Sequence, residues 1–171
     1  MLIGNKMSDA INAQIGNEFG ASLQYVAIAA YFGADSLPEL SAHFNRQALE
    51  ERDHAMKFVN FLVDAGAEAA IPAVPAPKSK FSNAEEAVQL SLDWEMAVTK
   101  QINALVDLAI KESDHLTREF LQWFVTEQLE EVSSMETLLK IVRRAGPNGL
   151  LFVEDYLARR GPVGPAPTGA P

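Results

Sequence analysis

The breaks between long helical segments are the feature that most restricts the fold of this chain. Apolar periodicity and turn residues predict four helices. The first is predicted to run from Ser8, a candidate N-cap, to about Ala34, and the second from the capping box Ser36-Leu37-Pro38-Glu39 to Gly66. The third runs from the capping box Ser82-Asn83-Ala84-Glu85 to about Lys111, and the fourth from near Asp114 to Gly146-Pro147. Each helix has about 27 to 31 residues, or about 40 to 46 Å, which is longer than ordinary globular helices. That length indicates a helical bundle.

Two of the breaks are short and one is long. The breaks at 35–36 and 112–114 are short enough to join antiparallel neighbours. The third, "AEAAIPAVPAPKSKF", contains three prolines, and its roughly 15 residues can span roughly 50 Å when extended. Because it can run the full length of a helix, we expect the second and third helices to be parallel. The sequence therefore predicts an all-α fold, a four-helix bundle with one long crossover.

The end of the chain differs in composition from the bundle. The segment "LLFVEDYLARR" is amphipathic and predicts a short fifth C-terminal helix of about three turns, whereas "GPVGPAPTGAP" is of low complexity. With 171 residues, the chain is long enough for one well-packed domain and short for two. We expect one domain over residues 1–160 and a flexible tail over residues 161–171.

Composition restricts the function. The chain has no cysteine, which excludes disulfides and thiolate metal sites and leaves oxygen and nitrogen ligands for hard or borderline metals. Fourteen Lys and Arg against twenty-three Asp and Glu give a net charge of -9, which disfavours nucleic acid and suits cations. No segment approaches the roughly 18 apolar residues of a membrane span, and the N-terminus lacks a secretory pattern. We therefore expect a cytoplasmic protein without nucleic-acid or membrane partners.

Every long helix places at least one carboxylate on its apolar face, taking about 100° per residue. These inward polar residues are Glu18, then Glu51 with His54, then Glu95, and finally Glu127, Gln128 and Glu131. Burying a charged group costs several kcal/mol unless a partner charge or a metal compensates. One carboxylate from each helix lies within about one turn of the helix midpoint, namely Glu18, Glu51, Glu95 and Glu131. In a bundle these four are therefore expected to meet at one level.

A dinuclear metal site would account for this crowding, because two divalent cations neutralise the neighbouring carboxylates. The Glu51-x-x-His54 spacing puts two ligands on one helix face, and a glutamate between two metals can bridge them. We expect Glu51 to bridge, with Glu18 and His54 completing the first site. The expected ligands of the second site are Glu95, Glu131 and Gln128. A third, weaker cation is expected beside them at Glu50, Glu127 and Glu130.

Three segments give the chain a resemblance to a known family. The segments "NEFGASLQYVAIAAYF", "ALEERDHAMKF" and "QWFVTEQLEEV" resemble the helix motifs of the non-haem bacterial ferritins, and the resemblance extends over about residues 8–160. It implies a ferritin-like bundle, a hollow shell of 24 subunits, and oxidation of Fe(II) by dioxygen or peroxide before the iron is stored as a mineral. By this resemblance, the family's first ferroxidase iron site corresponds to Glu18, Glu51 and His54. The second corresponds to Glu51, Glu95 and Glu131 with Gln128, and the third to Glu50, Glu127 and Glu130. Tyr25 corresponds to the tyrosine beside the diiron centre.

Single residues distinguish the neighbouring families. Bacterioferritins carry a haem-ligating methionine immediately after the bridging glutamate and a second E-x-x-H in the fourth helix. Here these positions hold Arg52 and Gln128-Leu129-Glu130-Glu131, so we expect no haem. Two alternatives stay open: a diiron oxidase or oxygenase that acts on an organic substrate, and a structural bundle with a vestigial site.

The first helix carries a second apolar stripe, made by Phe19, Leu23, Val26 and Ala30. An isolated bundle cannot bury both stripes of this helix. The second stripe therefore predicts an interface between copies of the chain.

Overall fold

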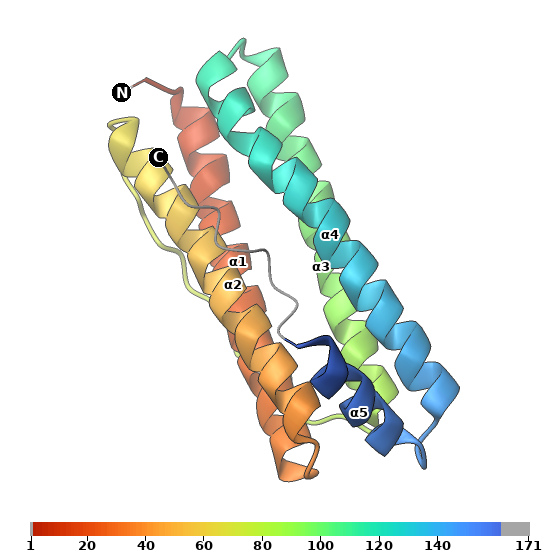
Figure 1. The fold of residues 1–171 in the computed structure, drawn as a ribbon. Helices are drawn as coiled ribbons and strands as arrows, with labels where there is room; N and C mark the ends of the chain where they lie inside the picture. Colours follow the sequence, from red (N-terminus) through yellow and green to blue (C-terminus); the bar gives the residue numbers. More distant parts are fainter. Residues whose placement is uncertain (1, 162–171) are drawn as a thin grey trace.

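Four long helices form a bundle, and a short fifth helix packs at one end of it (Figure 1). The structure is a computed structural model and describes residues 2–161. The helices are α1 (Asn5–Ala34), α2 (Pro38–Asp64), α3 (Ala84–Lys111), α4 (His115–Ala145) and α5 (Leu150–Arg160). Helices α1 and α2 form one antiparallel hairpin and α3 and α4 the other, while α2 and α3 run in the same direction.

This architecture confirms the predicted all-α bundle with one long crossover and a short C-terminal helix. No strand occurs between residues 2 and 161. Within the same range, the helices are too short or too polar for any of them to cross a membrane. Of the segment predicted to be a flexible tail, residues 162–171 lie outside the described residues.

The predicted start of α1 at Ser8 is wrong. The helix begins at Asn5 with Gly4 as its N-cap, and the backbone N–H of Ser8 already donates to the carbonyl of Gly4. Met7 explains the extension, because its side chain is fully buried in the core. Burial of this side chain outweighs the local preference of Ser8 for a cap position.

The capping box predicted for α2 does not form either. Ser36 has a φ of 59° and lies in the turn before the helix, and the N-cap is Leu37, which makes no side-chain cap. Instead, the carboxylate of Glu154 in α5 accepts hydrogen bonds from the backbone N–H groups of Glu39 (2.7 Å) and Leu40 (2.8 Å). A side chain 114 residues away thus caps α2 and fixes α5 against it.

The start of α3 lies one residue later than the predicted box. The side chain of Asn83, rather than Ser82, accepts from the backbone N–H of Glu86 at 2.8 Å, and the Glu86 carboxylate accepts from the N–H of Ser82 at 2.6 Å. The predicted start of α4 is confirmed, since Asp114 accepts from the backbone N–H of Thr117 at 2.9 Å.

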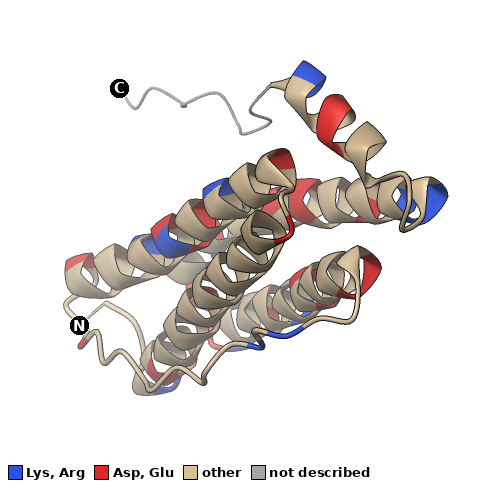
Figure 2. Cartoon of the chain, turned by 90° about the horizontal axis from the view of Figure 1, so that it is seen from below, with Lys and Arg blue, Asp and Glu red and all other residues tan. Residues whose placement is uncertain are grey.

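The crossover lies along one face of α1, on the outside of the bundle (Figures 1 and 2). Side-chain amides of α1 hold its backbone at two points. Asn12 forms hydrogen bonds with the backbone of Glu68 and Ala70, and Gln24 forms two with the backbone of Lys78. Between them, a Cβ added at Gly16 would lie 2.5 Å from the ring of Pro72. Glycine at this position lets the crossover approach α1 closely.

Two apolar clusters fill the bundle on either side of a polar layer. One cluster lies toward α5 and includes Phe32 and Phe44, and the other lies toward the opposite end and includes Ile11 and Phe58. In every long helix, the inward carboxylate falls in sequence between its members of the two clusters. The core therefore positions these carboxylates at one level.

Candidate metal centre

The polar layer consists mainly of acidic side chains, with one imidazole and one amide, all shielded from solvent. The exposed fraction is 4% or less for each of its main members, which are Glu18, Glu51, His54, Glu95, Glu131 and Gln128. They come from all four long helices, and Figure 2 shows acidic residues on each of these. All of these side chains are buried, in agreement with their predicted inward orientation.

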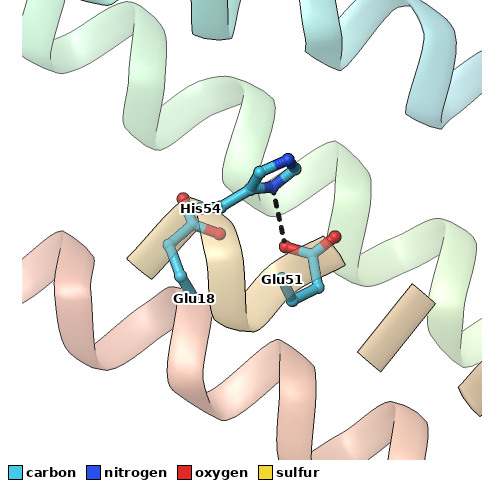
Figure 3. A group of neighbouring side chains, drawn as sticks. All are labelled: Glu18, Glu51 and His54. Carbon is cyan, nitrogen blue, oxygen red and sulfur yellow. Dashed lines mark hydrogen bonds and ion pairs between the residues drawn. The ribbon is translucent and has the colours of Figure 1, made fainter. Parts of the chain in front are cut away.

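The first group contains Glu18, Glu51 and His54 (Figure 3). Each residue offers one ligand atom, and the three atoms lie within 4.8 Å of one another. Nδ1 of His54 is 3.3 Å from Oε2 of Glu51, one turn earlier on α2. This spacing suits a single cation held by two carboxylates and one imidazole.

A second group contains Glu51, Glu95 and Glu131, whose ligand atoms also lie within 4.8 Å of one another. Glu51 therefore belongs to both groups, which is the position expected of a bridging carboxylate. A further group was not anticipated: His54 and Glu131 also meet Glu127, and Nε2 of His54 is 4.0 Å from the Glu127 carboxylate.

The third predicted cation site is arranged differently. Glu127 is buried, Glu50 is half-buried and Glu130 is exposed. Burial is the main cause that raises the pKa of Glu50, and the neighbouring Glu130 adds to it. Among the described residues, the groups whose ligand atoms all lie within 4.8 Å include neither Glu50 nor Glu130. A cation at these three residues stays a prediction.

Two carboxylate oxygens in the centre lack any hydrogen-bond partner among the described residues. They are Oε2 of Glu18 and Oε1 of Glu51. A buried oxygen without a partner costs about 1 to 3 kcal/mol, and more when it is charged. A cation between them would remove this cost, so the donor set fits a hard or borderline metal ion.

Burial controls the protonation of the centre. It raises the pKa of Glu18 and Glu95 to about 7 and that of Glu131 to about 9, and it raises the pKa of Glu51 well above its usual value. Burial also lowers the pKa of His54 to about 4, which keeps its imidazole neutral and able to bind a metal. Without cations, protons neutralise part of the cluster, and a bound metal would displace them.

Hydrogen bonds orient the acidic side chains. Gln14, one turn before Glu18, donates to its Oε1 at 2.8 Å. Thr99, one turn after Glu95, donates to Oε1 of Gln128 at 2.8 Å, and the amide nitrogen of Gln128 lies 3.5 Å from Glu95. Sequence reasoning missed Gln14 and Thr99, although both are polar residues one turn from an inward glutamate.

Aromatic rings enclose the centre. The hydroxyl of Tyr25 donates to Glu95, as expected of a residue beside the site. The ring of Trp123 lies 5.3 Å from that of His54 with its plane nearly perpendicular, and Phe58 stacks on Phe124 at 4.2 Å. These rings exclude water and so strengthen the electrostatic interactions within the cluster.

Comparisons with known proteins identify the family. The family model of the ferritin-like domain matches residues 8–145. Ferritin BfrB of Mycobacterium tuberculosis is 45% identical over 166 residues, covering 97% of this chain and 91% of the relative. The bacterial non-heme ferritin of Staphylococcus aureus is 37% identical over 161 residues, covering 93% and 97%.

A solved structure agrees with these sequence matches. An open pore ferritin from the archaeon Archaeoglobus fulgidus superposes with a TM-score of 0.89 at 34% identity, covering 94% of this chain and 99% of that one. The fold, the buried acidic layer and the sequence matches over nearly the whole chain lead to one conclusion: this chain belongs to the ferritin family.

Proposed function

We propose that this protein stores iron, oxidising Fe(II) to Fe(III) at the buried acidic centre and depositing it as a mineral inside a hollow shell of 24 copies. The observation that carries the proposal is the position of Glu51, which belongs to two groups of buried ligands at once. Two iron ions per chain would occupy these groups as substrates. The first would be held by Glu18, Glu51 and His54, and the second by Glu51, Glu95 and Glu131.

The ligand chemistry supports oxidation. Carboxylates stabilise Fe(III) more than Fe(II), which lowers the reduction potential of the iron and favours electron loss. Two Fe(II) ions supply two electrons, so dioxygen would be reduced to hydrogen peroxide, or hydrogen peroxide to water. Protons that leave the carboxylates when iron binds are available for this reduction.

The role of Gln128 follows from its contacts. Its oxygen accepts from Thr99 and its nitrogen faces Glu95, an arrangement in which the amide can orient the Glu95 carboxylate. We propose that Gln128 acts through Glu95. The prediction that Gln128 is itself a ligand stays open, because its amide oxygen has a second lone pair besides the one that accepts from Thr99.

The outer surface of α1 supports assembly into a homo-oligomer. Leu23 and Val26 are 45% and 48% exposed, Ala30 is also exposed, and Phe19 is half-buried. These four residues make up the predicted second stripe, most of which remains uncovered in the single chain. Contact with another copy would remove this apolar surface from water.

An oxidase or oxygenase with an organic substrate is less compatible with the centre. Such an enzyme needs room for its substrate beside the metals. Tyr25, Phe58 and Phe124 are all fully or almost fully buried there, and Trp123 packs against His54. Close-packed aromatic rings leave little space for a second substrate.

Fe(II) added to the purified, iron-free protein in air tests the proposal. We expect rapid formation of Fe(III), measured by ultraviolet absorbance, and uniform shells with dense cores in electron micrographs. Glu51→Gln should slow oxidation at least about tenfold, because it removes a charged ligand shared by both ions. The matched control is Asp53→Asn, an exposed acid two residues away on α2.

The results separate the alternatives. A vestigial bundle would show no oxidation above that of Fe(II) in buffer and no difference between Glu51→Gln and the parent protein. Rapid oxidation without retained mineral would support an oxidase and contradict storage.

A further inference from the structure

A second polar site lies between α2, α4 and α5, apart from the ligand groups of the acidic centre. It is a cavity of about 250 Å³ whose lining includes Arg46 of α2 and Arg160 at the end of α5. Drug-sized ligands occupy pockets of roughly 300 Å³ or more, so this cavity suits a small ion or molecule.

The lining is positive although the chain as a whole is acidic. Arg46 and Arg160 contribute two guanidinium groups against a single carboxylate, that of Glu130, in a chain of net charge -9. Within residues 2–161, Arg46 makes no ion pair. Arg160 donates to the hydroxyl of Tyr156 and lies 5.4 Å from its ring centre, which orients the guanidinium.

Hydroxyl groups gather on the α4 side of the cavity. Ser133, Ser134 and Thr137 all line it. Hydroxyls in helices often donate to a backbone carbonyl about one turn earlier, as Thr126 does here. No such hydrogen bond is formed by the three cavity residues in the described part of the chain, so their donors remain available to a ligand.

His43 adds a nitrogen atom to this lining. Its Nε2 is buried and has no hydrogen-bond partner among the described residues. Burial, together with the charge of Arg46, lowers the pKa of His43 to about 4. The imidazole is therefore neutral near pH 7, and the positive charge of the cavity comes from the arginines.

We propose that this cavity binds a tetrahedral oxyanion, with inorganic phosphate as the ligand. Guanidinium groups bind phosphate through paired, charge-assisted hydrogen bonds, and free hydroxyls can donate to the remaining oxygens. The exposed carboxylate of Glu130 opposes the anion and limits its affinity. The inference goes beyond the proposed function and does not depend on it, because phosphate binding is measured in the absence of iron.

Isothermal titration of the iron-free, full-length protein with inorganic phosphate tests the site. We expect one phosphate per chain, with Arg46→Gln weakening binding by about tenfold or more, since a hydrogen bond to a charged group is worth about 1.5 to 3 kcal/mol. The matched control is Arg52→Gln, which removes the same charge from an exposed position on α2 and should leave the affinity unchanged.

A substitution that is expected to increase the affinity for phosphate strengthens the test. Glu130→Gln removes the one opposing charge from the lining and should tighten phosphate binding, whereas Glu119→Gln, elsewhere on α4, should not. Thr137→Val provides a milder variant should Arg46→Gln fail to fold as judged by circular dichroism, and it should also weaken binding. Absence of phosphate binding to the parent protein, or equal weakening by Arg46→Gln and Arg52→Gln, would overturn the proposal.

Discussion

The hydroxyl of Tyr25 donates a hydrogen bond to the carboxylate of Glu95, so that a residue of α1 orients an acidic residue of α3. The same hydroxyl lies 3.4 Å from the backbone carbonyl of Ser91. Burial, followed by the charges of Glu95 and Glu51, raises the pKa of Tyr25 well above its usual value. The phenol therefore stays protonated and remains a donor throughout the neutral range.

We expect Tyr25→Phe to move the pH profile of Fe(II) oxidation to higher pH. The hydrogen bond from Tyr25 lowers the pKa of Glu95, which burial raises to about 7. Without the donor this pKa rises further, and iron then has to displace a more tightly held proton. Initial oxidation rates between pH 5.5 and about 8 would measure the shift. Tyr31→Phe, which changes a half-buried tyrosine near the end of α1, should leave the profile unchanged.

The iron-free protein should lose stability as the pH rises from 6.5 to about 9. The pKa of Glu18 and Glu95 is raised from 4.5 to about 7, and that of Glu131 to about 9, in each case mainly by burial. A carboxyl group with a higher pKa in the folded state contributes its full stability below the unfolded pKa and loses it as the pH rises through the folded pKa. His43 and His54, whose pKa values are lowered to about 4, act in the opposite direction only below pH 6.5.

Thermal unfolding of chelator-treated protein measures this dependence. Glu131→Gln should flatten the decrease in Tm between pH 6.5 and 9, while Glu136→Gln, an exposed substitution on α4, should not. Saturating Zn(II) should reverse the trend, because a bound metal replaces the protons and stabilises the folded state. A Tm that increases with pH in the metal-free protein would contradict the assigned burial of these carboxylates.

Zn(II) should inhibit Fe(II) oxidation. In the Irving-Williams order of divalent affinities, Zn(II) binds nitrogen and oxygen ligands more tightly than Fe(II) does, and Zn(II) cannot be oxidised. Initial rates measured with increasing Zn(II) should fall to the level of Glu51→Gln. Mg(II) at the same concentration serves as the control, because it keeps its hydration water and should have little effect. Unchanged rates at saturating zinc would count against this centre as the site of oxidation.

Glu154→Ala should lower the free energy of unfolding by about 1 to 2 kcal/mol, the usual value of a helix cap. The substitution removes both hydrogen bonds to the first turn of α2 and the anion at the positive end of its dipole. Chemical denaturation followed by circular dichroism would measure the loss. The neighbouring Asp155→Ala removes only an exposed ion pair with Arg159 and should cost a few tenths of a kcal/mol at most.

Much of the fold could be predicted because the signals are local and repeated. Four long apolar stripes, two short breaks and a proline-containing linker define the topology. The inward positions of Glu18, Glu51, Glu95 and Glu131 follow from helical periodicity, and the structure brings them together in the bundle. A cap supplied from α5, in contrast, has no local signal, which is why the sequence suggested Ser36.

The fine structure of the centre was less accessible to sequence reasoning. The approach of Glu127 to His54 and the contact of Thr99 with Gln128 depend on side-chain rotamers and on the rotation of α4 about its axis. Helical periodicity defines a face of about one third of the helix surface, and it cannot rank the two acids and the amide on that face of α4. For the same reason, the cavity at Arg46 has no signature in the sequence of α2 alone.

The two amide contacts of the crossover, at Asn12 and Gln24, set an order for refolding. They close segments of 54 to 58 residues, whereas the hairpin of α1 and α2 needs only a short turn. Closing a long loop costs more conformational entropy than forming a local contact, and it is therefore slower. The hairpin of α3 and α4 also has a short turn, so amide protons of all four long helices should become protected from exchange earlier than the crossover N–H groups of Ala70 and Lys78. The crossover would then dock last, onto two hairpins that have already formed.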